Sequence, residues 1–462
     1  MSVSLRAAPP GPGRPWAWQM LRYQREPIAY VERCAERYGP VFALRLPFVG
    51  SLVAAVDPVD VATILTGAPE RFPQGPAGSP IAPVMGERAM MFATGRQHRR
   101  QRQTLWPAFH GELVERWGGM MAAVAEAELA RVPLHEPFAA LPVARRIAVT
   151  AICRMVFGSI DPHSFARICD QVGRRDDPRL VLMLRFPTLW RRGGRLNPGA
   201  PLKRRRDELN RLLLHEIALR RRAAADGVDA RDDALSLLVT ARDEQGVPLS
   251  DAEVRDQLVG LLVVGHETTA AALAWALERL SRCSEARERL TQELAGDARG
   301  DAYLDAFVNE TLRLRPPLLD AVRTTTTPLD LGAYRVPAGT VVSAMCAIAQ
   351  RRGNVWEDPL AFRPERFLDG RPTPGVFAPF GGGPRRCIAA SVSTLLLRTV
   401  LRVAVARATV TDAPGPEEPA RLYGLSLLPA RGARVTLRPR TGARHSTRSS
   451  SISGGRVASQ LG

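Results

Sequence analysis

One octapeptide places a cysteine directly after glycines and arginines: residues 380–387 read Phe-Gly-Gly-Gly-Pro-Arg-Arg-Cys. Glycine lacks a Cβ and tolerates positive φ, so its backbone can approach a flat ligand closely. The apolar, helix-like segment 388–400 would direct its N-terminal amides at the sulfur, and the two arginines add positive charge. These influences favour a thiolate, which is a strong axial ligand for haem iron. A buried apolar cysteine is the alternative, but Phe380, Gly381, Gly383, Arg385 and Cys387 together favour iron ligation.

A second segment, 258–277, is an apolar helix-like run whose centre contains Gly265, His266, Glu267, Thr268 and Thr269. Polar groups at the centre of a membrane span are costly, so the pattern favours a buried helix in the protein core. Threonine hydroxyls can bond to the carbonyl one turn back and loosen the helix, which would leave room for dioxygen and water beside an iron. The alternative is a pair of threonines that only satisfy the backbone.

Two further segments carry charged residues at helical spacing. Glu310 and Arg313 share one face of a helix that a double proline ends. Taken alone, this is a surface ion pair worth about 0.2–0.5 kcal/mol. His98 and Arg102 also share a face, within a basic run that would ordinarily be solvated. Because arginine binds carboxylates through its planar fork, this face could instead hold an acidic group.

Together the four segments resemble the cytochrome P-450 superfamily of haem-thiolate monooxygenases. The cysteine segment matches the family pattern Phe-Gly-x-Gly-x-Arg/His-x-Cys-x-Gly except at Ala389, where the family has glycine. Residues 264–268 match the family pattern Ala/Gly-Gly-x-Asp/Glu-Thr except at Val264. The matches follow the family's order and extend over residues 95–400.

The resemblance implies a role for each matching residue. Cys387 would be the iron ligand of heme b (iron protoporphyrin IX), and Glu267 and Thr268 would deliver protons to dioxygen, the co-substrate. His266 would face away from the iron and be structural. The cofactor-binding residues would be His98, Arg102, Arg323, Phe380, Gly381, Gly383, Arg385 and Cys387. A structural ionic network beneath the cysteine loop would consist of Glu310, Arg313 and Arg366.

The composition limits the classes of partner. The net charge is +18, and nearly all of the positive charge is arginine, dispersed along the chain, since Lys203 is the only lysine. Aromatic residues make up only 6% of the chain, and no basic–aromatic stacking surface stands out, which argues against nucleic acid. The six cysteines lie far apart without a Cys-x-x-Cys pair, a pattern that favours a reducing, cytoplasmic location. The first 18 residues contain no apolar run, so we expect no signal peptide and no transmembrane anchor.

The distribution of elements predicts a mainly α fold with small β-sheets (α+β). By resemblance this is the cytochrome P-450 fold, with the haem between the long distal helix and the helix after the cysteine. Helical patterns dominate 112–280, while runs broken by Gly and Pro predict a small sheet over 324–347 and a hairpin over 425–437. The expected organisation is a Pro-rich segment (1–20), one catalytic domain (21–440) and a disordered Arg/Ser/Gly tail (441–462).

Two segments are expected to cover a substrate pocket: 179–196, which is apolar with a Gly-Gly pair, and 73–91, which is rich in Pro, Gly and Met. The helix after the first of these carries Leu209, Leu212, Leu213 and Ile217 on one face, with the basic runs 203–206 and 220–222 around them. A solvated helix over the pocket is the simpler interpretation. Binding of this basic helix to a membrane surface is the alternative.

We therefore expect a monomeric monooxygenase that inserts one oxygen atom from O₂ into a small apolar organic substrate. No flavin or ferredoxin module stands out in the chain, so electrons would come from a separate ferredoxin and ferredoxin reductase. Arg99, Arg100 and Arg386 are candidates for the docking surface. One alternative is an oxygen-independent isomerase or peroxygenase on the same fold, which the acid–alcohol pair disfavours. Another is a non-catalytic haem-binding sensor, for which no effector domain stands out.

Overall fold

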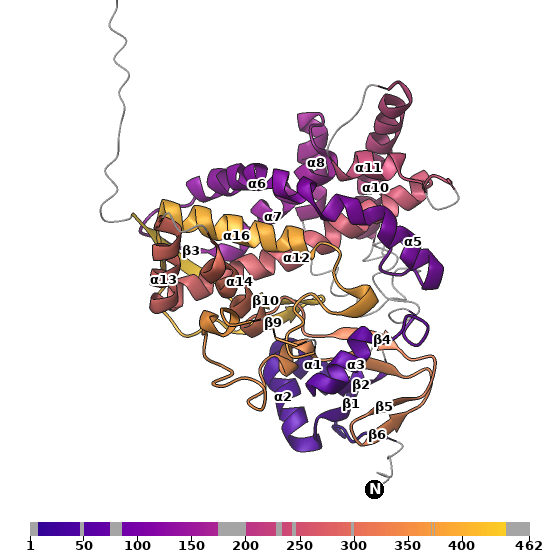
Figure 1. Cartoon of the computed structure of the whole chain (residues 1–462), viewed down its shortest axis with the longest axis vertical. Helices are drawn as coiled ribbons and strands as arrows, with labels where there is room; N and C mark the ends of the chain where they lie inside the picture. Colours follow the sequence, from indigo (N-terminus) through magenta and orange to yellow (C-terminus); the bar gives the residue numbers. More distant parts are fainter. Residues whose placement is uncertain are drawn as a thin grey trace, which may run out of the picture.

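The computed structural model describes residues 8–46, 50–73, 86–173, 200–227, 233–242, 246–296, 300–370, 372–373 and 375–439. The α-helices in this part of the chain (Figure 1) are α1 (Trp16–Arg25), α2 (Pro27–Tyr38), α3 (Pro58–Thr66), α5 (Gly95–Leu105), α6 (Glu112–Ala130), α7 (Ala140–Phe157), α8 (Pro162–Gly173), α10 (Ala200–Ala225), α11 (Ala234–Thr240), α12 (Asp251–Arg282), α13 (Ser284–Ala295), α14 (Ala302–Leu314), α15 (Cys346–Ala349) and α16 (Ala390–Arg407). Short 3-10 helices are η1 (Trp106–Phe109), η3 (Pro364–Phe367) and η4 (Gly383–Arg385). The strands are β1 (Val41–Leu46), β2 (Gly50–Ala55), β3 (Pro137–Ala139), β4 (Ala321–Thr324), β5 (Leu329–Leu331), β6 (Tyr334–Val336), β7 (Val341–Ala344), β8 (Thr409–Asp412), β9 (Ala420–Tyr423), β10 (Ser426–Pro429) and β11 (Arg434–Arg438).

The long helix α12 crosses the middle of the molecule (Figure 1). Ser250 begins it with a reciprocal cap: the Glu253 N–H donates to the Ser250 hydroxyl at 3.3 Å, and the Ser250 N–H donates to the Glu253 carboxylate at 2.9 Å. Among the described residues, α12 is the one helix long and apolar enough to match a membrane span, and 67% of its most apolar window is buried inside the protein. The prediction of a buried core helix over 258–277 is confirmed.

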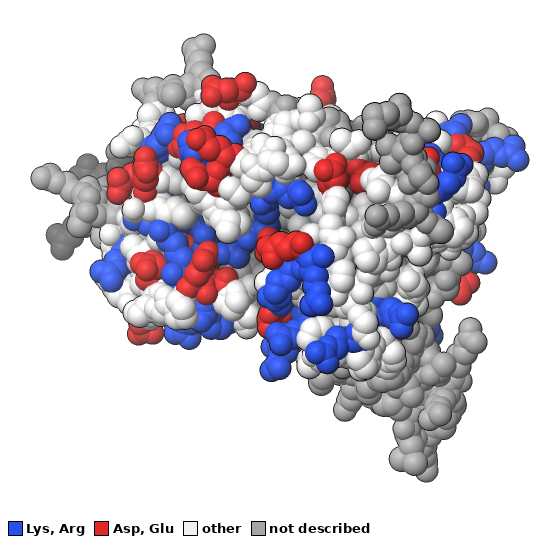
Figure 2. Space-filling view, turned by 90° about the horizontal axis from the view of Figure 1, so that it is seen from below, with Lys and Arg blue, Asp and Glu red and all other residues white. Residues whose placement is uncertain are grey.

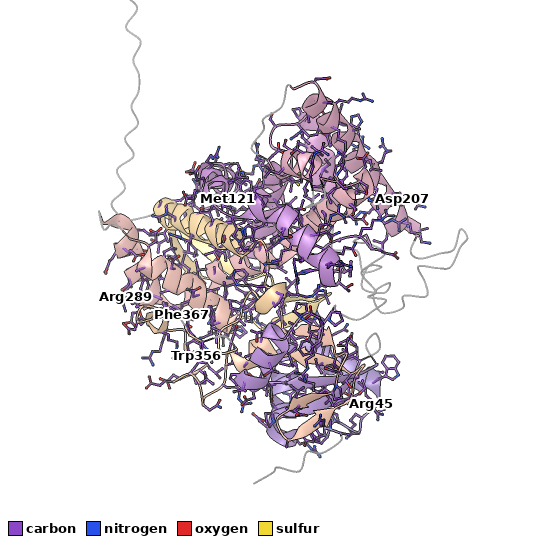
Figure 3. All side chains as sticks on the ribbon, turned by 45° about the vertical axis from the view of Figure 1, so that its right-hand side comes forward. Arg45, Met121, Asp207, Arg289, Trp356 and Phe367 are labelled. Atoms are coloured by element: carbon purple, nitrogen blue, oxygen red, sulfur yellow. The ribbon has the colours of Figure 1, made fainter. Side chains whose placement is uncertain are left out.

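The main hydrophobic core surrounds α12. Helices α6, α7, α11, α14 and α16 contribute apolar side chains to it, including the fully buried Met121 of α6, Phe157 of α7 and Phe307 of α14 (Figure 3 labels Met121). The periodicity that predicted alternating helices over 112–280 therefore reflects one face of each helix turned toward a shared interior.

A sheet in the order β1-β2-β7-β4 lies beside this helical body. Alternate residues of its strands face two separate apolar clusters, so Phe42 packs with the α1–α2 side, while Val41 packs with the α3 side. β2 pairs with β7 in parallel, and β4 pairs with β7 antiparallel. The strands predicted over 324–347 are present, but they divide between two sheets: β5 pairs with β6 alone, whereas β7 lies between β2 and β4. Arg323 lies on β4.

The hairpin predicted over 425–437 is wrong, because β10 and β11 belong to different sheets. β10 pairs with β9 across a two-residue turn whose first residue, Gly424, has φ 61°, a conformation that glycine adopts without strain. Pro429 is the last residue of β10. Its position lacks an N–H on the edge away from β9, where the Leu427 N–H bonds to the Pro317 carbonyl, so the pairing with β9 is not interrupted. A turn at Gly432, with φ 82°, then carries the chain to β11, which pairs with β8 and β3.

Several predicted segments fall outside the described residues, namely 179–196, most of 73–91 and the tail 441–462. The predicted apolar face of α10 is confirmed, since Leu209, Leu212, Leu213 and Ile217 are buried. Arg220, which was expected among the solvated basic residues of this helix, is instead buried. It forms an ion pair with Asp233 at 2.5 Å. On the face in Figure 2, basic and acidic side chains are interspersed, as the dispersed arginines suggest.

Candidate active site

The cysteine loop is shaped by glycines that no other residue would replace without strain. Gly381 and Gly383 have φ of 68° and 60°. A Cβ on Gly383 would lie 2.6 Å from the Leu65 carbonyl oxygen at the end of α3. The Cys387 N–H donates to the Phe380 carbonyl at 2.9 Å and so closes the loop. Ala389 has φ −91°, so this position, where the family has glycine, needs none here.

The Cys387 side chain is exposed on one side although protein surrounds it on the others. Burial is the largest influence on the thiol and raises its pKa above the usual value, while the Ala389 N–H, Arg386 and Arg102 lower it. The amide and the arginines thus favour the thiolate, as expected, but desolvation outweighs them in the free thiol. Coordination to a metal deprotonates a thiol outright. The Ala389 N–H and the two arginines would then stabilise the negative charge of a metal-bound sulfur.

Four basic side chains cluster beside the loop. His98 is buried, and burial, followed by Arg385, Arg102 and Arg323, lowers its pKa to about 4. Burial and then Arg323 lower the pKa of Arg385 to about 10. Each positive charge thus disfavours the protonation of its neighbours. The effect arises because α5, β4 and the cysteine loop bring these side chains close together.

The hydrogen bonds of these arginines go to backbone carbonyls. Arg102 donates to the Arg386 carbonyl at 2.8 Å, and Arg385 donates to the Ala93 carbonyl at 2.7 Å and to that of Pro73. Arg323 donates to its neighbour's carbonyl at 2.9 Å. In the part of the chain that the structure describes, none of the four basic groups forms an ion pair with a carboxylate. His98 is buried and the three arginines are partly buried. Cations withdrawn from water ordinarily have such partners, so the cluster fits a ligand that brings two carboxylates next to Cys387, as haem does.

The Thr268 turn of α12 lies against the helix that follows the cysteine. The Thr269 and Ser393 hydroxyls are 3.4 Å apart and link α12 to α16. Thr268 donates to the Val264 carbonyl at 3.1 Å, and Thr269 donates to the Gly265 carbonyl at 2.7 Å. The predicted hydroxyl-to-backbone bonds are therefore present, but α12 remains α-helical through this turn and does not widen into another helix type.

Glu267 is held by a residue that the sequence did not indicate. Its Oε1 accepts a hydrogen bond from Arg145 of α7 at 2.7 Å, and the two side chains are only 6% and 15% exposed. The partners are 122 residues apart, and Arg145 lies in an unremarkable Arg-Arg pair of α7, so no local pattern pointed to it. His266 is also buried, with Nδ1 2.7 Å from the Leu262 carbonyl and Nε2 3.7 Å from Glu267 Oε2.

The predicted ionic network is present as a set of contacts. Arg313 and Glu310 are both 0% exposed, and the guanidinium donates to both carboxylate oxygens at 2.6 and 2.8 Å. Arg366 Nε lies 3.4 Å from Glu310 Oε1, and the Arg363 N–H donates to the same oxygen at 2.8 Å. Arg313 also lies over the ring of Trp356, which packs against Phe367 (both labelled in Figure 3). The network thus joins α14 to the segment that leads to the cysteine loop.

The family model for cytochrome P-450 matches residues 9–435. The chain is 35% identical to cytochrome P-450 135B1 of Mycobacterium tuberculosis over 94% of this chain and 92% of that protein, and 34% identical to cytochrome P-450 137 of the same species over 93% and 91%. The retinoic-acid-bound cyanobacterial CYP120A1 shares the fold, with a TM-score of 0.79 at 24% identity over 95% of this chain and all of that structure. The cysteine loop, the long distal helix and the buried ionic network thus lie in a chain that belongs to the cytochrome P-450 family of haem-thiolate monooxygenases.

Proposed function

We propose that the protein binds heme b through Cys387 and inserts one oxygen atom from O₂ into a small apolar substrate, with electrons from a ferredoxin and its reductase. The observation that carries this proposal is the group of four basic side chains, the buried His98 and three partly buried arginines, that adjoins the cysteine loop and has no described carboxylate partner. His98, Arg102, Arg323 and Arg385 would bind the two propionates, and Gly381 and Gly383 would let the backbone lie close to the ring. When bound, the haem supplies oxygen activation, and the thiolate ligand donates electron density that favours O–O cleavage.

The protein's own part would be to supply protons and to exclude water. Thr268 and Glu267 occupy adjacent positions of α12, but their side chains have different partners. The Thr268 hydroxyl has a carbonyl acceptor and keeps its oxygen lone pairs for a water or a bound ligand. Glu267 would receive protons and pass them toward Thr268, and Arg145 would hold its carboxylate until it is needed. Arg145 is thus a positioning residue in this proposal.

Val264 supports an apolar substrate. It lies one turn before Thr268 and is 39% exposed, although most residues of α12 around it are buried. An exposed branched side chain at this position can contact an apolar ligand, and it can limit how closely that ligand approaches Thr268. Gly265 lets α12 lie close to α7, because a Cβ there would be 2.6 Å from the Ile152 side chain.

The docking surface for the electron donor is proposed on the cysteine side of the protein. Arg99 and Arg386 are exposed, as expected, whereas Arg100 is only partly exposed and is the weaker candidate. The structure adds Trp106, which is 44% exposed. Its ring stacks on His110 with centroids 3.4 Å apart and lies 5.5 Å from the Arg102 guanidinium carbon. A rigid aromatic residue with arginines around it is a common interface anchor, and the positive charge would attract an acidic ferredoxin.

A peroxide-dependent reaction is the second candidate. The ion pair between Arg145 and Glu267 favours it, because a carboxylate held by α7 is less available to manage protons at dioxygen. Peroxide brings both the oxygen atoms and the electrons, so it would need neither a ferredoxin nor an acid–alcohol relay.

Labelled oxygen distinguishes the two. Apolar ligands that shift the haem spectrum would first be selected as substrates, and turnover would be followed with ¹⁸O₂ in the presence of a ferredoxin and its reductase. We expect one ¹⁸O atom in the product and the other in water. Product formed only with added peroxide, and without label from ¹⁸O₂, would contradict the monooxygenase proposal.

A further inference from the structure

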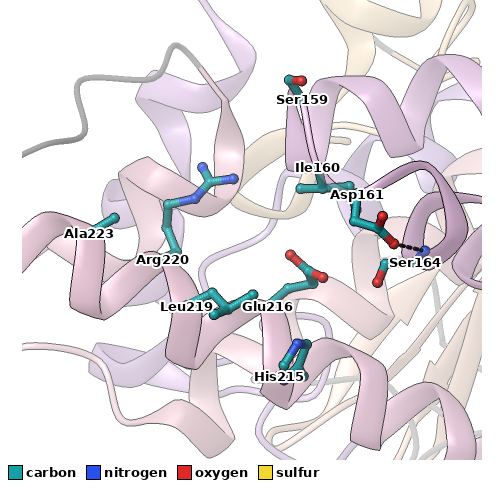
Figure 4. A pocket seen from close by; sticks show the side chains of 9 residues that line it. All are labelled: Ser159, Ile160, Asp161, Ser164, His215, Glu216, Leu219, Arg220 and Ala223. Atoms are coloured by element: carbon teal, nitrogen blue, oxygen red, sulfur yellow. Dashed lines mark hydrogen bonds between the residues drawn. The ribbon is translucent and has the colours of Figure 1, made fainter.

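A cavity of about 430 Å³ lies between the segment joining α7 to α8 and the C-terminal half of α10 (Figure 4). None of the residues assigned to the haem site lines it. Ile160 and Leu219 give it apolar walls, and its polar groups include Asp161, Ser164 and Glu216. The volume is within the range of small-molecule sites, and the lining combines apolar side chains with a larger number of polar and charged ones.

Glu216 is the informative residue in this cavity. It is only 6% exposed, yet it has no ion pair with any residue that the structure describes. Desolvation, reinforced by the charge of Asp161, raises the pKa of its carboxyl group above the usual value, although the nearby His215 and Arg220 and a hydrogen bond with the Ser164 side chain oppose this. A carboxylate buried without a cation is unstable, and the usual solution is a partner of opposite charge.

The nearest fixed cation is already occupied. Arg220, one turn after Glu216 on α10, is buried, forms an ion pair with Asp233 at 2.5 Å and donates to the Phe157 carbonyl at 3.0 Å. Figure 4 shows its guanidinium directed away from the Glu216 carboxylate, which points toward Asp161 and Ser164. Asp161 accepts the Ser164 N–H at 2.8 Å, and the pKa of Asp161 is lowered mainly by this bond, so a second negative charge lies at the same end of the cavity.

We propose that this cavity is a binding site for a small amphiphilic amine, with the ammonium group between Glu216 and Asp161 and a short apolar chain against Leu219 and Ile160. An ammonium group supplies the cation that Glu216 lacks and donates hydrogen bonds to both carboxylates. Charge-assisted hydrogen bonds of this kind are the strong ones. A neutral or anionic ligand of the same length would leave Glu216 uncompensated, so the site selects for the amine.

The proposal can be tested by isothermal titration calorimetry on the ferric holoenzyme with its iron saturated by imidazole, so that an added amine does not ligate the iron. The probes are hexylamine, hexan-1-ol and hexanoate, and the haem spectrum is recorded during each titration. We expect hexylamine to bind with a stoichiometry of one and without a spectral change. Hexan-1-ol and hexanoate should bind at least about tenfold more weakly, since a hydrogen bond to a charged group is worth about that factor.

Two variants and a control complete the test. Glu216→Gln keeps the shape of the side chain but removes its charge, and should weaken hexylamine about tenfold or more. Asp207→Asn removes one negative charge from the exposed first half of the same helix and should leave hexylamine affinity unchanged. If Glu216→Gln does not fold, Leu219→Trp, which fills the mouth of the cavity from an exposed position, should abolish binding instead. No saturable binding of hexylamine, equal affinity in the wild type and Glu216→Gln, or equal affinity for hexan-1-ol would each overturn the proposal.

Discussion

Replacing Glu310 by glutamine should destabilise the protein far more than its size suggests. The carboxylate accepts three hydrogen bonds at 2.6–2.8 Å, two from Arg313 and one from the Arg363 N–H, and Arg313 has no exposed surface. The glutamine amide would turn an N–H₂ group toward one of these donors and would leave the guanidinium charge buried without compensation. Removing one partner of a buried ion pair costs about 3–5 kcal/mol, which is a large part of a total stability of about 5–15 kcal/mol.

This loss corresponds to about two to four powers of ten in the folding equilibrium. It can be measured by urea unfolding of Glu310→Gln and of wild type, with haem retention read from the Soret absorbance. Asp330→Asn is the matched control. Asp330 and Arg335 form an ion pair at 3.7 Å with both side chains more than half exposed, so its loss should cost at most about 1 kcal/mol. If Glu310→Gln unfolds at the same urea concentration as Asp330→Asn, the network does not stabilise the fold as argued.

The remaining predictions concern the other site residues. Thr268→Ala should still accept electrons but divert them to peroxide, since loss of a positioned proton-transfer group costs about 10²–10⁴-fold in the assisted step. Thr269→Val is the control. An unchanged product yield per electron in Thr268→Ala would refute the assignment. The pKa of His98 is lowered to about 4 from 6.5, so the unfolded chain binds a proton between these pH values that the folded chain does not. The unfolding free energy of the haem-free protein should therefore fall as pH drops through this window, and less so in His98→Gln; an equal pH dependence in the two would contradict the clustering of the basic groups. Trp106→Ala should slow reduction by ferredoxin but not by dithionite, and the ferredoxin rate should fall with added salt; equal ferredoxin rates in mutant and wild type would remove Trp106 from the docking surface.

The sequence predicted the parts of this structure that are encoded locally. Gly381 and Gly383 adopt the positive φ that their residue type permits, and the apolar run around Glu267 forms a buried helix with a capping box at its start. The Gly- and Pro-broken segment over 324–347 likewise forms short strands. In each case a few neighbouring residues determine the backbone, so one chain segment carries the signal.

The remaining features depend on contacts between distant segments. The ion pair between Arg145 and Glu267 joins two helices, and nothing near either residue specifies the other. The partner of β10 is β9, which precedes it, and not β11, which follows it. The choice depends on which strand edge the fold leaves available, so the prediction of a hairpin over 425–437 was wrong. The desolvation of Cys387 and the burial of Arg220 are also set by the whole packed structure. Local charge patterns in the sequence do not predict how far burial outweighs neighbouring charges in setting the pKa of a side chain.

The measurement that tests the central claim most directly is the spectrum of the reduced, carbon-monoxide-bound protein in Cys387→Ser, with Cys283→Ser as the control. Cys283 precedes α13 and is not part of the loop, so its variant should keep the strongly red-shifted Soret band of a thiolate-ligated haem, as should the wild type. Cys387→Ser should lose that band, because an alcohol does not supply the electron density of a thiolate. A red-shifted band that persists in Cys387→Ser would show that another residue ligates the iron and would contradict the account of the site.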